Sequence, residues 1–244
     1  MIIYGINPVL EALRAGRVKA LRISSRDDER MRELLAFAST HGITPQRVSS
    51  DVLSRQAHGG VHQGVVADVD DASEYSLDDL VSGARGAPLI LVLDGIEDPH
   101  NLGAILRSAD ATGVDGVVIQ SRRSAARSAV AAKASAGALA HVKMAPVVNI
   151  ARALEELKEL GLWIVGLAGE AATPYDAVDF LSPTAIVLGA EGPGLRRLVR
   201  EKCDHMTSIP MQGRVGSINV SVAAGVVLFE AVRQRRNARV TGQD

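Results

Sequence analysis

Short apolar runs bounded by turn residues limit the fold of this chain more than any other feature. The runs LILVL and AIVL carry no polar side chain, which is typical of parallel strands that are buried on both faces. Stretches with helical spacing separate such runs, and this repeated order predicts an α/β domain with helices on both faces of a parallel sheet. Strands are predicted at residues 89–93, 116–120, 142–145, 162–167 and 185–188, and helices at 98–112, 129–136 and 150–160.

A smaller α/β unit is predicted at residues 1–70. Asn7 and Pro8 have the residue types that cap and begin a helix. The stretch 71–86 is rich in Asp, Ser and Gly, and it is predicted to be the linker to a second domain at 87–244. The strands of the small unit are predicted at residues 20–24, 46–49 and 64–69, and its helices at 9–15, 29–39 and 51–56.

Composition excludes several classes of protein. The single cysteine, Cys203, rules out an internal disulfide and fits a cytoplasmic protein. No apolar run approaches the roughly 20 residues that span a bilayer, so no membrane association is expected. His58 and His62 stand four apart, but two glycines separate them and no third ligand is near. We therefore expect no bound metal.

The candidate site lies where residues 184–194, TAIVLGAEGPG, lead from an apolar strand into a glycine turn that carries Glu191. Ligands of open α/β sheets bind at the carboxyl ends of strands. Pro193 and Gly194 are predicted to begin a helix. A second turn follows at 209–219, ahead of an apolar helix predicted at 220–229. The P-loop, GxSxG and HExxH motifs are all missing from the sequence.

Three segments resemble the motifs of a known family. LDGIEDPHNLGAILRSADATGVDGVVI, IVLGAEGPGLR and IPMQGRVGSINVSVAAGVVLFEA are similar, in this order, to the three motifs of the SpoU (TrmH) branch of the SPOUT RNA methyltransferases. The likeness extends to IYGINPVLEAL and HQGVVADV near the amino terminus, so it covers nearly the whole chain. Within the branch it is strongest to enzymes that methylate a guanosine 2'-hydroxyl of 23S ribosomal RNA.

This resemblance implies a fold, a cofactor and partners. Residues 1–70 would be an L30e-like domain that binds the RNA substrate, with the loop at 58–62 touching RNA. The second domain would be an α/β SPOUT domain with a deep trefoil knot, which binds S-adenosylmethionine and forms a homodimer through the helix at 220–229.

The resemblance also implies two groups of site residues. Four of the five catalytic candidates have a plain alternative: a surface ion pair for Arg107, and helix capping for Glu191, Ser217 and Asn219. Ile218 stands where the family usually has leucine. The catalytic group would be Asn101, Arg107, Glu191, Ser217 and Asn219, and the cofactor group Leu188, Gly189, Gly192, Ile209, Met211 and Ile218.

Arg107 is expected to act without giving up its proton. A guanidinium is almost never neutral in a protein. We therefore expect Arg107 to hold the phosphate of the target nucleotide and to stabilise the developing alkoxide, in place of serving as the general base.

Other readings of the sequence stay open. Transfer RNA methyltransferases and resistance-type ribosomal RNA methyltransferases share the three motifs, and a non-catalytic RNA-binding or ribosome-assembly protein could keep the fold. The separate amino-terminal domain favours ribosomal RNA, and the intact set of catalytic candidates favours an enzyme. Two basic segments have no assigned role: the loop SRRSAAR at 121–127, and the arginine-rich tail after Glu230, which is predicted to fray.

Overall fold

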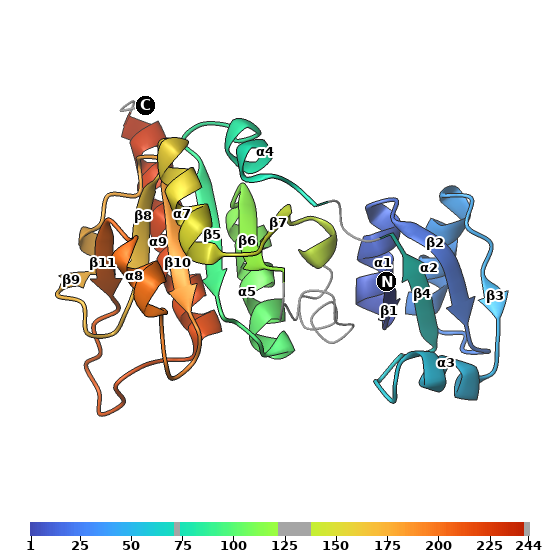
Figure 1. Cartoon of the computed structure of the whole chain (residues 1–244). Helices are drawn as coiled ribbons and strands as arrows, with labels where there is room; N and C mark the ends of the chain where they lie inside the picture. The colour runs from blue at the N-terminus through green and yellow to red at the C-terminus, as the bar shows by residue number, and fades with distance from the viewer. Residues whose placement is uncertain (71–73, 122–137, 242–244) are drawn as a thin grey trace. The chain divides into compact units, whose positions relative to one another are not determined.

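A computed structural model describes residues 1–70, 74–121 and 138–241. Most of the predicted basic loop at 121–127 and all of the predicted helix at 129–136 lie outside these residues. Contacts within the chain divide it into two compact units (Figure 1). Residues 1–72 make up most of the first unit, and residues 142–244 make up most of the second.

The first unit contains a four-stranded sheet in the order β1-β4-β2-β3. Both β1 and β2 pair antiparallel with β4, and β3 pairs parallel with β2. The predicted alternation of strands and helices is present in this unit, but strand β1 was not predicted. The elements are β1 (Ile2–Tyr4), α1 (Ile6–Arg14), β2 (Val18–Ile23), α2 (Glu29–Thr40), β3 (Gln46–Arg47), α3 (Ser50–Gln56) and β4 (Val65–Val69).

Helix α1 begins earlier than predicted. Gly5 precedes it with a φ of 95°, a conformation that glycine adopts easily. The side-chain oxygen of Gln63 accepts a hydrogen bond from the Ile6 amide at 2.9 Å. The prediction that Asn7 caps this helix is therefore wrong, because Asn7 lies inside the first turn and a distant glutamine binds an amide there.

The second unit contains a seven-stranded sheet in the order β7-β6-β5-β10-β8-β11-β9, and all of its strand pairs are parallel. The predicted parallel α/β sheet is confirmed, and β6 has the predicted bounds. The sequence did not predict β9 or β11. The strands are β5 (Leu89–Asp94), β6 (Gly116–Gln120), β7 (Met144–Val147), β8 (Trp163–Leu167), β9 (Thr173–Pro174), β10 (Thr184–Gly189) and β11 (His205–Ser208).

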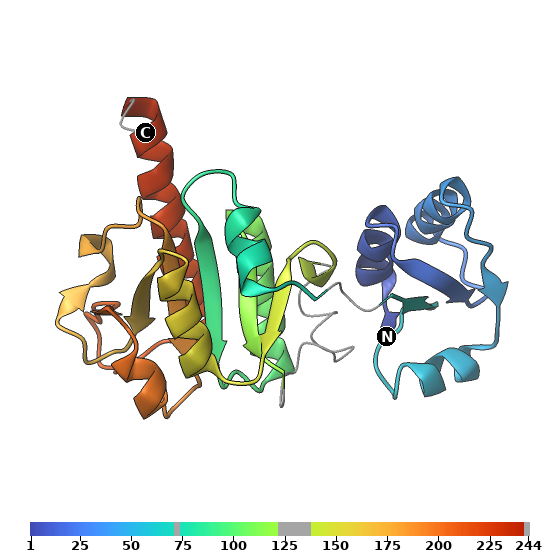
Figure 2. The same cartoon turned by 45° about the horizontal axis from the view of Figure 1, so that its top comes forward.

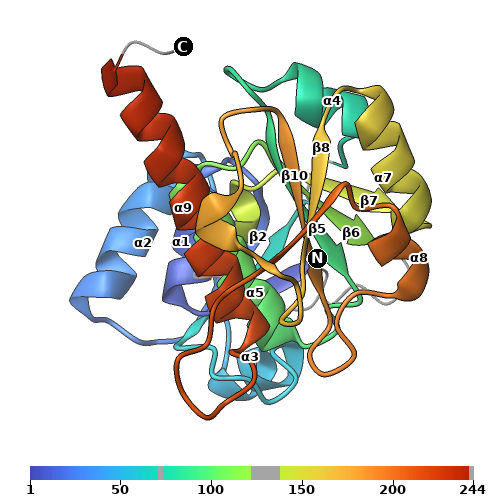
Figure 3. The same cartoon turned by 90° about the vertical axis from the view of Figure 1, so that its left-hand side faces the viewer.

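Helices cover both faces of this sheet. Figure 3 shows α4, α7 and α8 on one face, and α9 with the end of α5 on the other. Alternate residues of each strand enter the two cores; Ile90 and Val92, for example, pack in one cluster with Leu154 of α7. The helices are α4 (Leu77–Ser82), α5 (Pro99–Thr112), α7 (Ile150–Glu159), α8 (Arg197–Glu201) and α9 (Val220–Thr241).

Helix α4 lies within the stretch that was predicted to be a linker. Ser76 and Asp79 form a capping box at its start, which satisfies two backbone amides. Leu77 and Leu80 are buried in the same cluster as Ile90. Residues 77–82 are thus part of the core of the second unit.

Helix α9 is much longer than the predicted segment at 220–229. It runs along the sheet and continues toward the carboxyl terminus (Figure 2). The prediction of a frayed tail is wrong, because Ala231 and Ala238 are buried on this helix. No helix in the described part of the chain combines the length and apolar character needed to cross a membrane.

Arg235 fixes the second half of α9. Its guanidinium donates to the carbonyls of Phe180 at 2.8 Å, Ala87 at 2.6 Å, Pro88 at 3.1 Å and Ser182 at 3.3 Å. Burial lowers the pKa of this guanidinium from its ordinary value. One side chain thus ties α9 to the segments that precede β5 and β10.

We predict that Arg235→Ala destabilises the second unit by about 1–3 kcal/mol, because it leaves carbonyl groups without their donor. Arg236→Ala, at an exposed neighbouring position, should change stability by no more than about 0.5 kcal/mol. Trp163 is the single tryptophan and belongs to β8, so its fluorescence during urea unfolding follows this unit alone. Equal midpoints for the two variants would contradict the role of Arg235.

Candidate functional site

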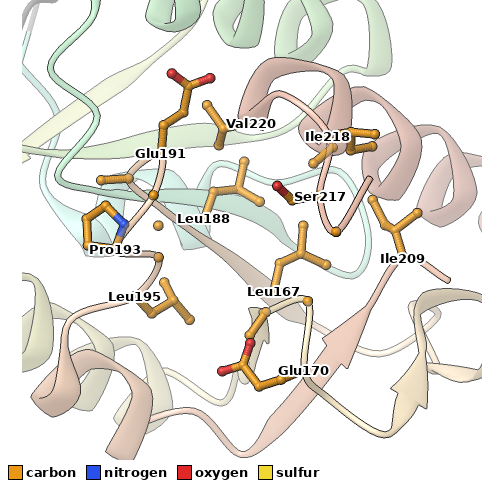
Figure 4. A pocket seen from close by; sticks show the side chains of 18 of the residues that line it. Leu167, Glu170, Leu188, Glu191, Pro193, Leu195, Ile209, Ser217, Ile218 and Val220 are labelled. Carbon is orange, nitrogen blue, oxygen red and sulfur yellow. The ribbon is translucent and has the colours of Figure 1, made fainter. Parts of the chain in front are cut away.

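A cavity of about 810 Å³ lies at the carboxyl ends of β8 and β10. Its walls come from the turns after these strands, the segment after β11 and the start of α9 (Figure 4). All but two of the predicted site residues line this cavity. The predicted residues in the lining are Leu188, Gly189, Glu191, Gly192, Ile209, Met211, Ser217, Ile218 and Asn219.

The turn after β10 folds back onto the end of its own strand. Ala190 and Gly194 exchange two backbone hydrogen bonds, at 3.2 and 3.0 Å. A Cβ atom on Gly189 would lie 2.2 Å from the carbonyl carbon of Gly194, so only glycine fits there. Gly194 has a φ of 68°, which is not helical. The prediction that Pro193 and Gly194 begin a helix is therefore wrong, and α8 begins at Arg197.

A buried carboxylate holds the far end of this turn. Asp94, the last residue of β5, is fully buried. Its two oxygens accept from the Arg196 backbone amide at 2.9 Å and from the Arg196 Nε at 2.6 Å. A buried carboxylate requires such partners. The turn between Gly189 and Arg196 is thus fixed to two neighbouring strands, β10 and β5.

Asn219 connects this turn to the segment after β11. Its Nδ2 donates to Glu191 Oε1 at 2.6 Å. Its Oδ1 accepts from the Ser221 amide at 2.8 Å and from the Ser221 hydroxyl at 2.5 Å, at the start of α9. Asn219 therefore has a capping role and a bridging role at once. The alternative that Glu191 caps the next helix is wrong, since α8 has no side-chain cap.

The cavity is lined by both apolar and polar groups, with carboxylates at opposite ends. Figure 4 shows Leu167, Leu188, Ile209 and Ile218 around a common space, with the hydroxyl of Ser217 between them. The carboxylates of Glu191 and Glu170 lie at two ends of this space. Such a lining suits a ligand with a flat apolar part and a charged part.

Sequence reasoning missed Glu170 and Arg200, which both line the cavity and form an ion pair with each other. The backbone amide of Glu170 and the guanidinium of Arg200 hold the pKa of the Glu170 carboxyl below its ordinary value, so it is charged at neutral pH. A signal was present in the sequence. The run LAGE at the end of β8 repeats the pattern of LGAE at the end of β10, an acid shortly after a buried strand.

Asn101 and Arg107 are the two predicted site residues outside the cavity lining. Asn101 is buried in the first turn of α5, as its predicted place in an entry turn requires, and Arg107 is exposed on the same helix. The structure does not bring these two residues together with the other candidates.

Of the two histidines considered as metal ligands, His62 has other partners. The Nδ1 of His62 accepts from the Gly64 amide at 3.1 Å, which leaves its Nε2 protonated to donate to Ser54 at 3.2 Å. His58 has a positive φ of 49° in the same loop. Across the described ranges, no three or more His, Cys, Asp or Glu side chains are grouped so that they could hold a metal ion.

Comparison with known proteins identifies the family. Residues 88–229 match the model of the SpoU rRNA Methylase family, and residues 2–75 match a model described as RNA 2'-O ribose methyltransferase substrate binding. The chain belongs to the SpoU rRNA methylase family. The match includes every predicted site residue, and the resemblance inferred from the three motifs is confirmed.

Curated relatives in this SpoU family are similar over almost their full length. The 23S rRNA (guanosine-2'-O-)-methyltransferase RlmB of Yersinia pestis is 47% identical over 239 residues, which cover 96% of this chain and 97% of that protein. RlmB of Shewanella oneidensis is 46% identical over 242 residues, covering 97% and 98%.

Solved structures of SpoU enzymes have the same fold. The SpoU methyltransferase AviRb of Streptomyces viridochromogenes is 27% identical with a TM-score of 0.83, covering 98% of this chain and 90% of that one. The complex of AviRb with the cofactor AdoMet is 28% identical with a TM-score of 0.82, covering 97% and 91%.

Proposed function

We propose that this chain transfers the methyl group of S-adenosylmethionine to the ribose 2'-hydroxyl of a guanosine in 23S ribosomal RNA. The observation that carries the proposal is the likeness to RlmB enzymes, at 47% identity over 96% of the chain. This likeness includes a substrate-binding segment at residues 2–75, which favours ribosomal RNA over the transfer RNA alternative. A ribosomal RNA substrate implies a cytoplasmic enzyme.

The cavity fits S-adenosylmethionine. Its volume of about 810 Å³ is within the usual range of small-molecule pockets, roughly 300–1,000 Å³. Leu188, Ile209, Met211 and Ile218 provide apolar surface for the adenosine, and Gly189 and Gly192 let the backbone approach it closely. When bound, the cofactor supplies a methyl group already activated by its sulfonium, so the site needs no metal.

The remaining candidates position the reacting groups. Glu191 and Asn219 hold the two turns together, and Ser217 places a hydroxyl inside the cavity. Arg107 binds the target phosphate and stabilises the alkoxide that develops at the 2'-oxygen, while Asn101 orders the start of the same helix. The 2'-hydroxyl proton leaves to the phosphate or to water as the oxygen attacks the methyl group. An alkoxide and a sulfonium lose their charges as they react, so the apolar walls favour the reaction by excluding water.

We predict that Arg107→Ala lowers the single-turnover rate of methylation about 100- to 1,000-fold, as removal of an oxyanion donor does. Arg107→Lys should also be impaired, because it lacks the planar fork that can contact a phosphate and the 2'-oxygen together. The affinity for S-adenosylmethionine should stay unchanged, since Arg107 does not line the cavity.

The assay uses fragments of 23S ribosomal RNA, and the methylated nucleotide is mapped in the product. Arg85→Ala, at another exposed arginine, should keep the parental rate. A near-parental rate for Arg107→Ala would remove Arg107 from the mechanism. Methylation of transfer RNA alone, or of no RNA, would contradict the proposed function itself.

We infer that the chain acts as a homodimer. One face of α9 packs in the core through Ala224, Val227 and Leu228. Val222 and Phe229, seven residues apart and so on one helical face, are 54% and 55% exposed. An exposed apolar helix face of this kind favours a partner surface, and the family resemblance places the dimer interface on this helix.

We predict that Phe229→Asp yields a folded monomer at micromolar concentration in sedimentation analysis. The side chain is already half exposed, so the charge should not unfold the chain. Val240→Asp, at an 83% exposed position on the last turn of α9, is the matched control and should remain a dimer. A parent that sediments as a monomer would contradict the inference.

The domain division and the trefoil knot are further parts of the proposal. We assign residues 1–70 to an L30e-like RNA-binding domain and 87–244 to the catalytic domain. The predicted connection at 71–86 is shortened to the residues before α4, because α4 packs in the core of the second unit. Strand order supports a knot, because β10 lies between β5 and β8 whereas β11 lies beyond β8. The chain after Glu191 therefore crosses β8 before α9 packs on β10. An experimental chain trace without threading, or proteolysis that spares residues 71–76, would contradict these assignments.

A further inference from the structure

A second cavity, of about 500 Å³, lies at the same edge of the sheet. Its walls come from the end of β6, the turn between β7 and α7, and the start of α8; Figure 3 shows α8 beside α7. Residues 196–199 line this second cavity, and residues 188–195 line the first one. One continuous segment therefore separates the two cavities.

The second cavity has an apolar floor and exposed apolar walls. Ile150 and Val199 are buried beneath it, at 1% and 2% exposure. Val148 and Leu198 are 72% and 53% exposed, although they lie beside a concave surface. Two large apolar side chains in water next to a hollow favour a flat apolar ligand.

Two arginines also line this cavity. The side chain of Arg196 is 51% exposed even though Asp94 holds it from below. Arg197 pairs with Glu201 of its own helix, at 2.5 Å, and both side chains are largely exposed. Such a surface pair is worth roughly 0–1 kcal/mol, so a phosphate can replace the carboxylate at little cost. A guanidinium also matches phosphate geometry with two parallel hydrogen bonds.

Two side-chain amides complete the lining. Gln120 donates from Nε2 to the Val148 carbonyl at 3.3 Å. Asn149 accepts the Arg152 amide at 3.3 Å as the cap of α7. Both contacts hold the amides in place at the wall of the cavity. Side-chain amides are the groups that proteins commonly use to hydrogen-bond the edges of nucleobases.

We propose that the second cavity binds an unstacked nucleotide of the RNA substrate, a neighbour of the nucleotide that is methylated. Its base packs on Val148 and Leu198, and its phosphate contacts Arg196 and Arg197. A duplex must open for an enzyme to bring one nucleotide into its pocket, and the bases beside it then lose their stacking partners. The second cavity offers such a base an apolar surface in place of its lost stacking partner. This inference rests on the proposed function.

The charge of the cavity favours RNA over a protein segment as the occupant. Its arginines provide positive charge at the wall and its floor is apolar, which matches the phosphate and the base of a nucleotide. The volume of about 500 Å³ is within the range for one small ligand. Its place beside the first cavity lets a single RNA strand reach both.

Two variants test this inference in the full-length protein, with a 23S ribosomal RNA fragment as the probe. Leu198→Asp and Arg197→Glu should each weaken RNA binding about tenfold, which corresponds to the loss of one stacking or phosphate contact. The affinity for S-adenosylmethionine and the single-turnover rate at saturating RNA should stay within about twofold of the parent. Leu181→Asp, at an exposed leucine near the amino end of β10, is the matched control and should bind RNA as the parent does.

A photoreactive residue in place of Val148 gives an independent readout. It should crosslink to a nucleotide within a few positions of the methylated guanosine. Parental RNA affinity in both variants together with no such crosslink would overturn the inference, and so would crosslinks in cell extract that reach only ribosomal proteins. A parent that methylates RNA under these conditions separates this failure from a failure of the proposed function.

Discussion

The hydrogen bond between Asn219 and Glu191 is the contact on which the geometry of the first cavity depends. It joins two turns whose residues are 28 positions apart in the chain, with 2.6 Å between Nδ2 and Oε1. This bond ties the turn after β10 to the segment before α9. Because Asn219 also caps α9 through its other amide atom, the long helix and the cavity wall are fixed together.

The ends of β5 and β10 hold the turn that carries Glu191 in place. Asp94 and Gly189 end neighbouring strands in direct register. The first binds Arg196 at the end of the turn, and the second has no Cβ, which lets Gly194 lie against it. Loops that carry function are commonly held in this way by a buried scaffold. The same segment continues into α8 and forms a wall of the second cavity, so the contacts of Asp94 and Gly189 position the walls of both cavities.

Local sequence predicted those parts of the fold that depend on local pattern. Apolar runs identified β5, β6 and β10, and helical spacing with flanking glycines identified α5 and α7. Strand β11 was missed because its residues, HMTS, are not an apolar run. The tail of α9 was missed because the partners of Arg235 lie between 53 and 148 residues away in the chain. Four arginines in a polar tail gave no sign of those buried carbonyls.

The parts of the candidate site that have a local sequence pattern were predicted, and the parts that depend on contacts between distant segments were missed. Glycine turns at strand ends marked Gly189, Glu191 and Gly192, and the family motifs added Ser217 and Asn219. The likeness of LAGE to LGAE marks Glu170, but its ion pair with Arg200 joins segments 30 residues apart, and no sequence pattern links those two positions. Arg107 and Asn101 lie outside the cavity of the single chain, so their part in the reaction stays a prediction from the resemblance.

Calorimetric titration with S-adenosylmethionine tests the central claim, that two turns joined by Glu191 and Asn219 form the cofactor site. The parent is compared with Glu191→Ala, Asn219→Ala and the double variant. Each single variant should lose affinity about fivefold to tenfold, and the double variant should lose little more than either, because one contact couples the two residues. No binding heat in the parent, or losses that multiply in the double variant, would contradict the account.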